Sequence, residues 1–254
     1  MEKLGLDEYI FPVEQRSVDL NEVLDQHDFG QGPGSEPGYK VILRADTGEI
    51  ISVVRNSYHL ITNEELISQF FSELKKRDIP AFADYSHSYV NNRQMRFQVT
   101  LPDINFEDGE SEISLAVFLH NSYDATVPVR IVFGAIRLVC ANGMVITESK
   151  TMFTLRHVAR VKLDSIVARA VSAMIDEWSI VEEKVRMLAA APFDADIYDR
   201  IEKLMGETWG KYLRSQQADT MWDAYNSITR HISLEILIED RARHQHNVGR
   251  VFGL

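Results

Sequence analysis

The chain has 254 residues, with 27 lysines and arginines against 38 aspartates and glutamates, which gives a net charge of −11. This length and a hydrophobic share of 45% suffice for a buried core and exclude a chain that is disordered throughout. The single cysteine excludes an intramolecular disulfide framework and a multi-cysteine metal centre. No apolar run approaches the ~20 residues that span a bilayer, and the acidic N-terminus does not resemble a signal peptide, so we expect a cytoplasmic protein.

Charge is distributed unevenly along the chain. Residues 1–36 contain nine acidic and two basic side chains, whereas residues 129–162 contain six basic side chains and one acidic. A local positive field within an acidic chain is what a phosphate-binding surface requires, and His157 would add to it at mildly acidic pH. A solvated face that balances an acidic neighbour would have the same composition. The six basic residues are Arg130, Arg137, Lys150, Arg156, Arg160 and Lys162.

The N-terminal segment ends in residues 30–38, which include four glycines and two prolines and therefore predict a linker or mobile loop. We assign residues 1–38 to an acidic arm with this linker. The β-branched runs 39–44 and 50–54 follow, and the turn between them predicts a hairpin. A helix then begins near residue 63, with Thr62 or Asn63 as its N-cap, and ends before Pro80.

Residues 81–146 alternate between apolar and polar side chains or form short apolar runs, which predicts a series of antiparallel hairpins. A long helix is expected from Asp164 to Pro192, and shorter helices over 194–206 and 216–240. This order predicts an α+β fold. We expect an antiparallel sheet with a packed helix over residues 39–162 and a helical extension over residues 163–254.

The sequence contains no glycine-rich phosphate loop and no Gly-x-Ser-x-Gly elbow, so it predicts no catalytic residue, metal or cofactor. Asp103 and Glu112 faintly resemble the acid pair of metal-dependent nucleases, but acidic clusters in loops are usually only solvated. His244 and His246 could ligate a metal, although they fall where loose polar tails are common. Cys140 lies in an apolar run, which favours a buried and inert thiol.

Side chains suited to nucleic acid occur in and beside the basic stretch. Arg93 and Arg96 lie on the same predicted hairpin as Tyr89. Arginines favour phosphate contacts, and a tyrosine at a strand end can stack on an unpaired base. Tyr85 and Tyr123 occupy similar positions, but for each tyrosine taken singly a place in the core is the better prediction.

Four segments resemble the ordered motifs of a phage- and plasmid-borne family that has no assigned function. They lie within residues 38–235, and Gly143 departs from the threonine that is usual in the second motif. The resemblance implies a protein of mobile elements in a bacterial host cell. The four segments are Arg44-Ala45-Asp46-Thr47-Gly48 with the following Ile50–Val54 and Tyr58, then Arg137–Met144, then Arg156-His157, and finally Thr220–Thr229.

The predicted order of elements is also similar to that of Rad52-like annealing proteins, which is an analogy at the level of the fold. It implies a recombination protein that binds single-stranded DNA and anneals complementary strands without ATP, as a homo-oligomeric ring or filament. The phosphates would be held by Arg93, Arg96, Arg130, Arg137, Lys150, Arg156, Arg160 and Lys162, with Tyr89 beside them.

Two alternatives remain open. The total charge of −11 favours an acidic protein-interaction module, such as an inhibitor of host defence that mimics DNA. A metal-dependent nuclease would instead use Asp103, Glu107 or Glu112. The acidic residues 1–36 could compete with DNA for a basic groove or mediate subunit contacts. For Asn142 and Asn226, which fall in the motifs, we favour hydrogen bonding to the backbone.

Overall fold

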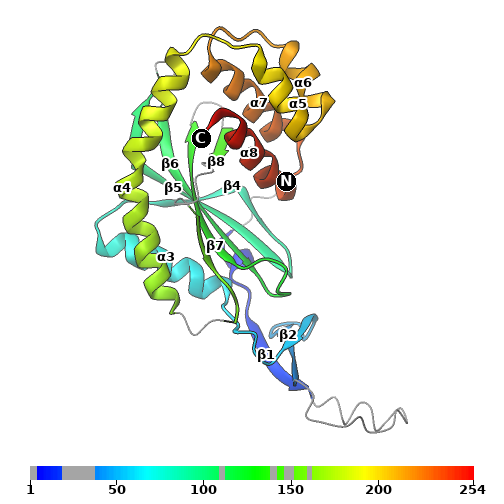
Figure 1. The fold of residues 1–254 in the computed structure, drawn as a ribbon. Helices are drawn as coiled ribbons and strands as arrows, with labels where there is room; N and C mark the ends of the chain where they lie inside the picture. Colours follow the sequence, from blue (N-terminus) through cyan, green and yellow to red (C-terminus); the bar gives the residue numbers. More distant parts are fainter. Residues whose placement is uncertain (1–4, 19–37, 109–111, 138–141, 146–151, 159–161) are drawn as a thin grey trace.

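The computed structural model describes residues 5–18, 38–108, 112–137, 142–145, 152–158 and 162–254; residues 137, 142–145, 238, 239 and 242 are described by their backbone alone. Within these ranges, two antiparallel sheets and a set of helices form an α+β fold, as the sequence predicts (Figure 1). The small sheet has the strand order β1-β2-β3, with β1 (Val13–Val18), β2 (Tyr39–Arg44) and β3 (Ile50–Arg55). The large sheet has the order β4-β5-β6-β7-β8, and β9 pairs with β7. Its strands are β4 (Phe82–Val90), β5 (Gln94–Glu107), β6 (Glu112–Ser122), β7 (Val129–Arg137), β8 (Asn142–Val145) and β9 (Met152–Leu155).

The predicted hairpin is confirmed as β2 and β3, and the family-like motif at residues 44–48 forms its turn. Gly48 adopts a φ of +72°, a conformation that side chains with a Cβ rarely adopt. The Arg44 guanidinium donates to both Asp46 carboxylate oxygens, at 3.0 and 2.7 Å, and lies 4.2 Å from the centre of the Phe11 ring. The motif therefore has a structural role at this turn.

Residues of the predicted N-terminal arm also contribute to the folded structure. β1 pairs with β2 along its whole length, from Val13 opposite Arg44 to Val18 opposite Tyr39. The short helix α1 (Leu6–Tyr9) places Tyr9 in the main hydrophobic core, where it is fully buried. Residues 19–37 of the arm and its linker lie outside the described residues.

Two helices cover one face of the large sheet (Figure 1). In α3 (Asn63–Lys76), Thr62 is the N-cap and its hydroxyl accepts a hydrogen bond from the Glu65 amide at 3.0 Å. The long helix α4 (Leu163–Ala190) has Lys162 as its N-cap, so the prediction of Asp164 as the cap is wrong and Asp164 lies in the first turn. The helices pack on every second side chain along each strand. Phe97 of β5 and Leu119 of β6 are examples, and both belong to the main hydrophobic core. This face of the sheet is entirely apolar over its buried centre.

The C-terminal region is helical, as predicted, but it contains more helices than the sequence suggests. They are α5 (Asp196–Met205), α6 (Glu207–Arg214), α7 (Met221–Glu235) and α8 (Ile238–Phe252). A capping box between Thr220 and Asp223 starts α7. The prediction that His244 and His246 lie in a loose tail is wrong, because buried Val248 and other apolar side chains of the next turns hold α8 in the core. None of the helices in the described ranges is both long and apolar enough to cross a bilayer.

Candidate functional site

A row of polar and charged side chains crosses the large sheet on the face that α3 and α4 leave uncovered. The strand register places Tyr89 of β4 opposite Arg96 of β5, Arg96 opposite His120 of β6, and His120 opposite Arg130 of β7. Neighbours in register point to the same side of a sheet. The pairing therefore brings together a tyrosine and two arginines that the sequence analysis selected, and adds a histidine.

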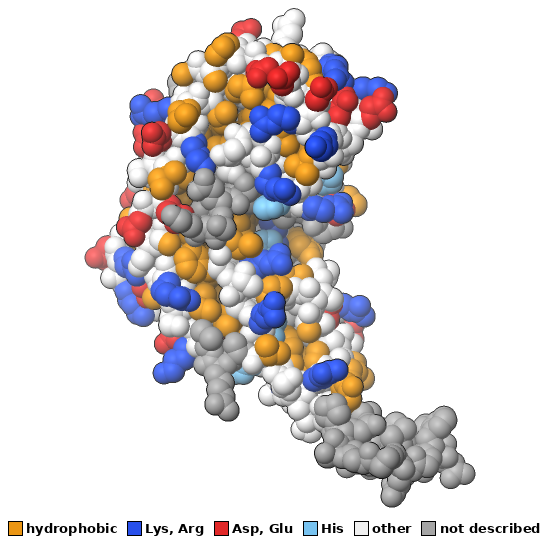
Figure 2. Space-filling view, viewed as in Figure 1, with side chains coloured by type: hydrophobic (Ala, Val, Ile, Leu, Met, Phe, Trp, Pro, Cys, Tyr) orange, Lys and Arg blue, Asp and Glu red, His pale blue; other side chains and the backbone are white. Residues whose placement is uncertain are grey.

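This row lines a cavity of about 440 Å³. Helix α8 contributes Arg243 and His246 to it, from the side opposite the sheet. Figure 2 shows lysine, arginine and histidine side chains gathered around a hollow near the middle of this view, while acidic side chains lie at the upper end and along the left edge. No acidic side chain is among the described residues that line the cavity, which we call the cationic pocket. Its lining is Tyr89, Gln94, Arg96, Phe118, His120, Val127, Arg130, Val132, Met152, Arg243 and His246.

Arg96 is the most unusual residue of the cationic pocket, because its side chain is charged and only 3% of its surface is exposed. The guanidinium lies 4.5 Å from the centre of the Phe118 ring and donates from Nη2 to Gln245 Oε1 at 3.3 Å. Within the described ranges, its Nε has no hydrogen-bond partner and no carboxylate pairs with the guanidinium. Burial, assisted by the nearby Arg241, lowers the pKa of Arg96 to about 10, so the side chain stays charged at neutral pH. A buried cation without a counter-ion favours an anionic ligand.

The two histidines of the cationic pocket are neutral at pH 7. Burial is the main cause that lowers the pKa of His120 to about 3, and the charges of Arg96 and Arg130 lower it further. Burial, Arg250 and Arg130 likewise lower the pKa of His246 below its ordinary value. Each neutral ring offers one N–H donor and one acceptor nitrogen. The positive charge of the pocket therefore comes from its arginines, while the histidines can add hydrogen bonds.

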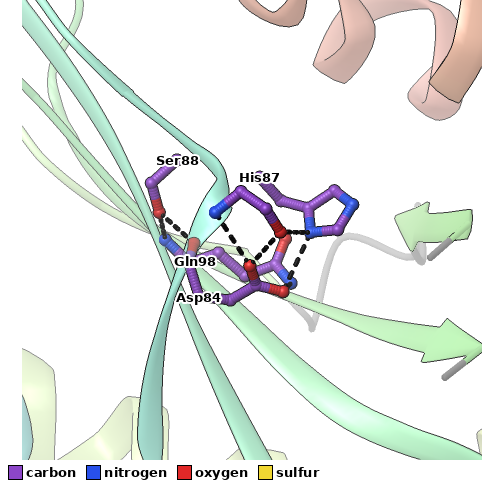
Figure 3. A network of polar contacts seen from close by, with 5 residues as sticks. Asp84, His87, Ser88 and Gln98 are labelled. Atoms are coloured by element: carbon purple, nitrogen blue, oxygen red, sulfur yellow. Dashed lines mark hydrogen bonds and ion pairs between the residues drawn. The ribbon is translucent and has the colours of Figure 1, made fainter. Parts of the chain in front are cut away.

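A polar network next to the pocket shapes strand β4 (Figure 3). Asp84 pairs with Gln98 and Tyr89 pairs with Arg96, so β4 has three more residues than β5 between these pairs and forms a bulge. Gln98 Nε2 donates to Asp84 Oδ2 at 3.1 Å, and the Ser88 hydroxyl donates to the Asp84 carbonyl at 2.7 Å. These contacts fix the bulge that brings Tyr89 into register with the arginines.

The same network contains a serine, a histidine and an aspartate, but its geometry does not suit nucleophilic catalysis. Ser86 Oγ lies 3.0 Å and Asp84 Oδ2 lies 2.8 Å from the same ring nitrogen, Nδ1 of His87. A catalytic triad needs the serine and the acid on opposite ring nitrogens. Burial alone would raise the pKa of Asp84, but hydrogen bonds from His87 and Ser86 outweigh it and hold that pKa below its ordinary value. The network is therefore a support for the bulge.

Of the remaining predicted phosphate contacts, those whose side chains the structure describes do not line the pocket. Arg93 is exposed in the turn after β4, and Arg156 and Lys162 are exposed, but none of the three lines the cavity. Arg137 is described by its backbone alone, and Lys150, Arg160 and Cys140 lie outside the described residues. Of the nine predicted contacts, the pocket thus contains Tyr89, Arg96 and Arg130.

His157 lies in the core and is not part of an exposed basic surface, contrary to the prediction. Its side chain is buried and its ring stacks on Tyr58 with 4.7 Å between the ring centres. Burial is the main cause that lowers its pKa below the ordinary value. Tyr123 is also buried, and its hydroxyl accepts a hydrogen bond from the Asn63 amide at 2.8 Å. Tyr85 packs against Phe97, with 6.0 Å between the ring centres. For both tyrosines the core alternative is the correct one.

Phe118, His120 and Arg243 line the pocket but were not selected from the sequence, and His246 was considered there only as a metal ligand. Phe118 lies in an apolar run that predicts a fully buried strand, and His120 follows that run directly. Nothing in the run indicates which side chains share a face with Arg96. Arg243 and His246 are three residues apart, a spacing that places both on one helix face. That spacing becomes informative only once residues 238–252 are recognised as a helix.

The acidic residues of the nuclease alternative lie away from the pocket. Asp103 and Glu107 are exposed on β5, and Glu107 is paired with Glu112 across the hairpin. In the parts of the chain that the structure describes, no three side chains of histidine, cysteine, aspartate or glutamate are grouped so that they could hold a metal ion. Asp103, Glu107 and Glu112 thus form no metal site within those parts.

Comparison with known proteins identifies one family. A domain of unknown function (DUF932) matches residues 50–250. This range begins with β3 of the small sheet, includes the whole large sheet, and ends within the last turn of α8. Neither a curated protein nor a solved structure shows significant similarity to the chain.

Proposed function

The chain belongs to the DUF932 family of domains of unknown function, and from that premise we propose that it binds single-stranded DNA in the cationic pocket. The observation that carries this proposal is Arg96, a guanidinium buried beside a cavity without a carboxylate partner in the described residues. A phosphate group would supply the missing negative charge and accept from the free Nε. Arg130 and Arg243 are exposed where they line the pocket and can complete the contact with phosphate.

The dimensions of the pocket favour an unpaired strand. A cavity of about 440 Å³ falls within the range of ~300–1,000 Å³ that is typical of sites for small ligands. One nucleotide is a ligand of this size, whereas a base pair with two backbones is not. Tyr89 forms part of the wall, with its hydroxyl donating to Gln94 Oε1 at 2.9 Å. Its ring is the surface on which we expect a base to lie.

The wider activity that we propose is annealing of complementary strands by a homo-oligomer, as in Rad52-like proteins. Annealing needs positions that hold the backbone and leave bases accessible, and it needs no nucleotide hydrolysis. A row of side chains that crosses a sheet would repeat from subunit to subunit in a ring or filament. We propose that the protein acts in this way during recombination of mobile elements.

Fluorescence anisotropy tests the proposal directly. A labelled single-stranded oligonucleotide and its duplex are titrated with the full chain over a range of salt concentrations. We expect the single strand to bind more tightly, with a log–log salt slope of about −0.7 for each phosphate neutralised. Arg96→Met combined with Arg130→Gln should weaken binding by about tenfold or more and make the salt slope shallower.

Arg186→Gln is the matched control for charge. Arg186 is exposed on α4 and pairs with Glu182 on the same helix, so the substitution removes a surface arginine away from the pocket. Equal losses in the control and in the pocket variants would refute the pocket as the binding site. Absence of binding at low salt would refute DNA binding altogether, and the acidic interaction module would then be the better account of the net charge of −11.

A further inference from the structure

We infer that the cationic pocket receives the terminal phosphate of a nucleic-acid strand, a phosphomonoester, in preference to the bridging phosphates inside the strand. This inference rests on the proposed function and specifies its ligand. The shared chemistry is that of a nucleotide with a free phosphate group, which a strand end and a free mononucleotide both supply.

The first argument is the amount of positive charge in one cavity. Arg96, Arg130 and Arg243 all line it, and its described lining includes no acid. Arg243 also lies 3.3 Å from an Asp240 carboxylate oxygen, but both side chains are more than half exposed, so this pair competes weakly with a ligand. A bridging phosphate carries one negative charge, whereas a phosphomonoester carries about −1.5 to −2 near pH 7. A phosphomonoester therefore neutralises more of the charge of the three guanidiniums than a bridging phosphate does.

The second argument is the depth at which one of these charges lies. Arg96 is buried in the middle of the sheet row, whereas Arg130 and Arg243 are exposed. A phosphate that contacts Arg96 must enter the cavity. A bridging phosphate would bring a sugar on each side into the same space, while a terminal phosphate brings one sugar and leaves the rest of the strand outside. The arrangement of one deep and two shallow arginines therefore favours a strand end.

The neutral histidines supply the third argument. His120 lies between Arg96 and Arg130 in the row, and His246 lies across the cavity on α8. A phosphomonoester has three terminal oxygens, and a bridging phosphate has two that are free. The imidazole N–H groups add donors to those of the three guanidiniums, and the additional terminal oxygen of a phosphomonoester gives these donors more acceptor sites than a bridging phosphate does.

The test compares strands of one sequence that differ only at their ends, each labelled internally. The forms are a 5′-phosphate, a 3′-phosphate, hydroxyls at both ends, and a circle without ends, all measured against the full chain by anisotropy. At least one phosphorylated form should bind about tenfold or more tightly than the hydroxyl-ended and circular forms. Thymidine monophosphate should compete for the pocket, and thymidine should not.

Arg243→Gln provides the decisive variant, because Arg243 is exposed on α8 and its replacement should not affect folding. The advantage of the phosphorylated end should be lost in this variant and kept in Arg186→Gln. Equal binding of all four single strands would overturn this inference and leave the proposed DNA binding standing. Competition by thymidine monophosphate without an advantage for any phosphorylated strand would overturn the strand end as the source and identify a mononucleotide. Binding of none of the strands would refute the proposed function itself.

Discussion

The two faces of the large sheet differ in what they bury. On one face, the side chains of β5, β6 and β7 meet α3 and α4 in an apolar core that contains Phe97, Leu119 and Ile131. On the other face, strand β5 buries Arg96, Gln98 and Thr100, and each of them has a side-chain atom that finds no hydrogen-bond partner among the described residues. Unpartnered polar atoms cost stability. The first face thus stabilises the fold, whereas the second face contains buried polar groups, of which Arg96 lines the cationic pocket.

The largest expected effect is on the apolar face. Phe97→Ala should lower the free energy of unfolding by about 3–5 kcal/mol, because it leaves a cavity between α1 and the sheet. The Phe97 ring packs edge-on against Tyr9, with 5.1 Å between the ring centres. Urea denaturation followed by circular dichroism measures the loss. Arg93→Ala in the exposed turn is the control and should change stability by less than about 0.5 kcal/mol; similar losses in the two variants would contradict the assignment of the core.

A pair of reciprocal substitutions compares the faces at neighbouring positions of β5. Val99→Thr places a hydroxyl in the apolar core and should destabilise the protein by about 1–3 kcal/mol. Thr100→Val removes a buried hydroxyl that has no partner in the described structure and should stabilise by up to about 1 kcal/mol. The same denaturation experiment gives both values. If Thr100→Val destabilises as much as Val99→Thr, the polar face is satisfied by water and the contrast between the faces is wrong.

Asp84→Asn tests whether the bulge of β4 depends on a charged carboxylate. The substitution weakens hydrogen bonds from Ser86, His87 and Gln98, and should cost about 1–2 kcal/mol at pH 7. The pKa of Asp84 is lowered in the folded state, so its carboxylate stabilises the protein above the unfolded pKa of about 3.9. This stabilisation is lost as pH falls through the pKa of the folded state. The stability difference between wild type and Asp84→Asn should therefore shrink below about pH 4. A difference that stays constant down to pH 2 would show that the charge is not involved.

The smallest expected effect on stability belongs to Arg96→Met. The substitution loses one hydrogen bond and a cation–π contact of about 1 kcal/mol, but it also removes the desolvation penalty of a buried charge. Stability should be unchanged or rise by about 1 kcal/mol, while affinity for single-stranded DNA falls. Thermal unfolding and anisotropy on the same sample measure the two properties. A strong loss of stability would mean that Arg96 stabilises the fold. The contrast between a stabilising apolar face and a ligand-binding polar face would then be wrong.

Most of the fold follows from local sequence patterns. Turn residues specify the hairpin at residues 39–55, and the Thr62 hydroxyl specifies the N-cap of α3. Apolar periodicity specifies the long helix before Pro192. All three signals act over a few residues. Helix α8 escaped prediction because its polar first half has a weak apolar stripe, and tertiary packing of its second half stabilises it.

The candidate site was predictable only in part, since it depends on register. Arg96 and Tyr89 could be selected because they lie on one hairpin, but Tyr89 faces Arg96 only through the bulge at residues 84–89. Arg130 becomes a neighbour of Arg96 through the intervening His120. A shift of one residue in either pairing would move these side chains to the apolar face. A basic stretch in the sequence does not specify such a register.

The position of α8 late in the chain has a consequence for the order in which the protein is built during synthesis. The arginine row is complete once residue 130 has left the ribosome, whereas the wall formed by Arg243 and His246 follows more than a hundred residues later. Arg96 contacts Gln245 of α8, so before α8 docks we expect the guanidinium to be more hydrated and its charge to cost less. Docking of α8 is then the step that dehydrates the guanidinium, and an anion bound in the pocket at that moment would favour completion of the fold.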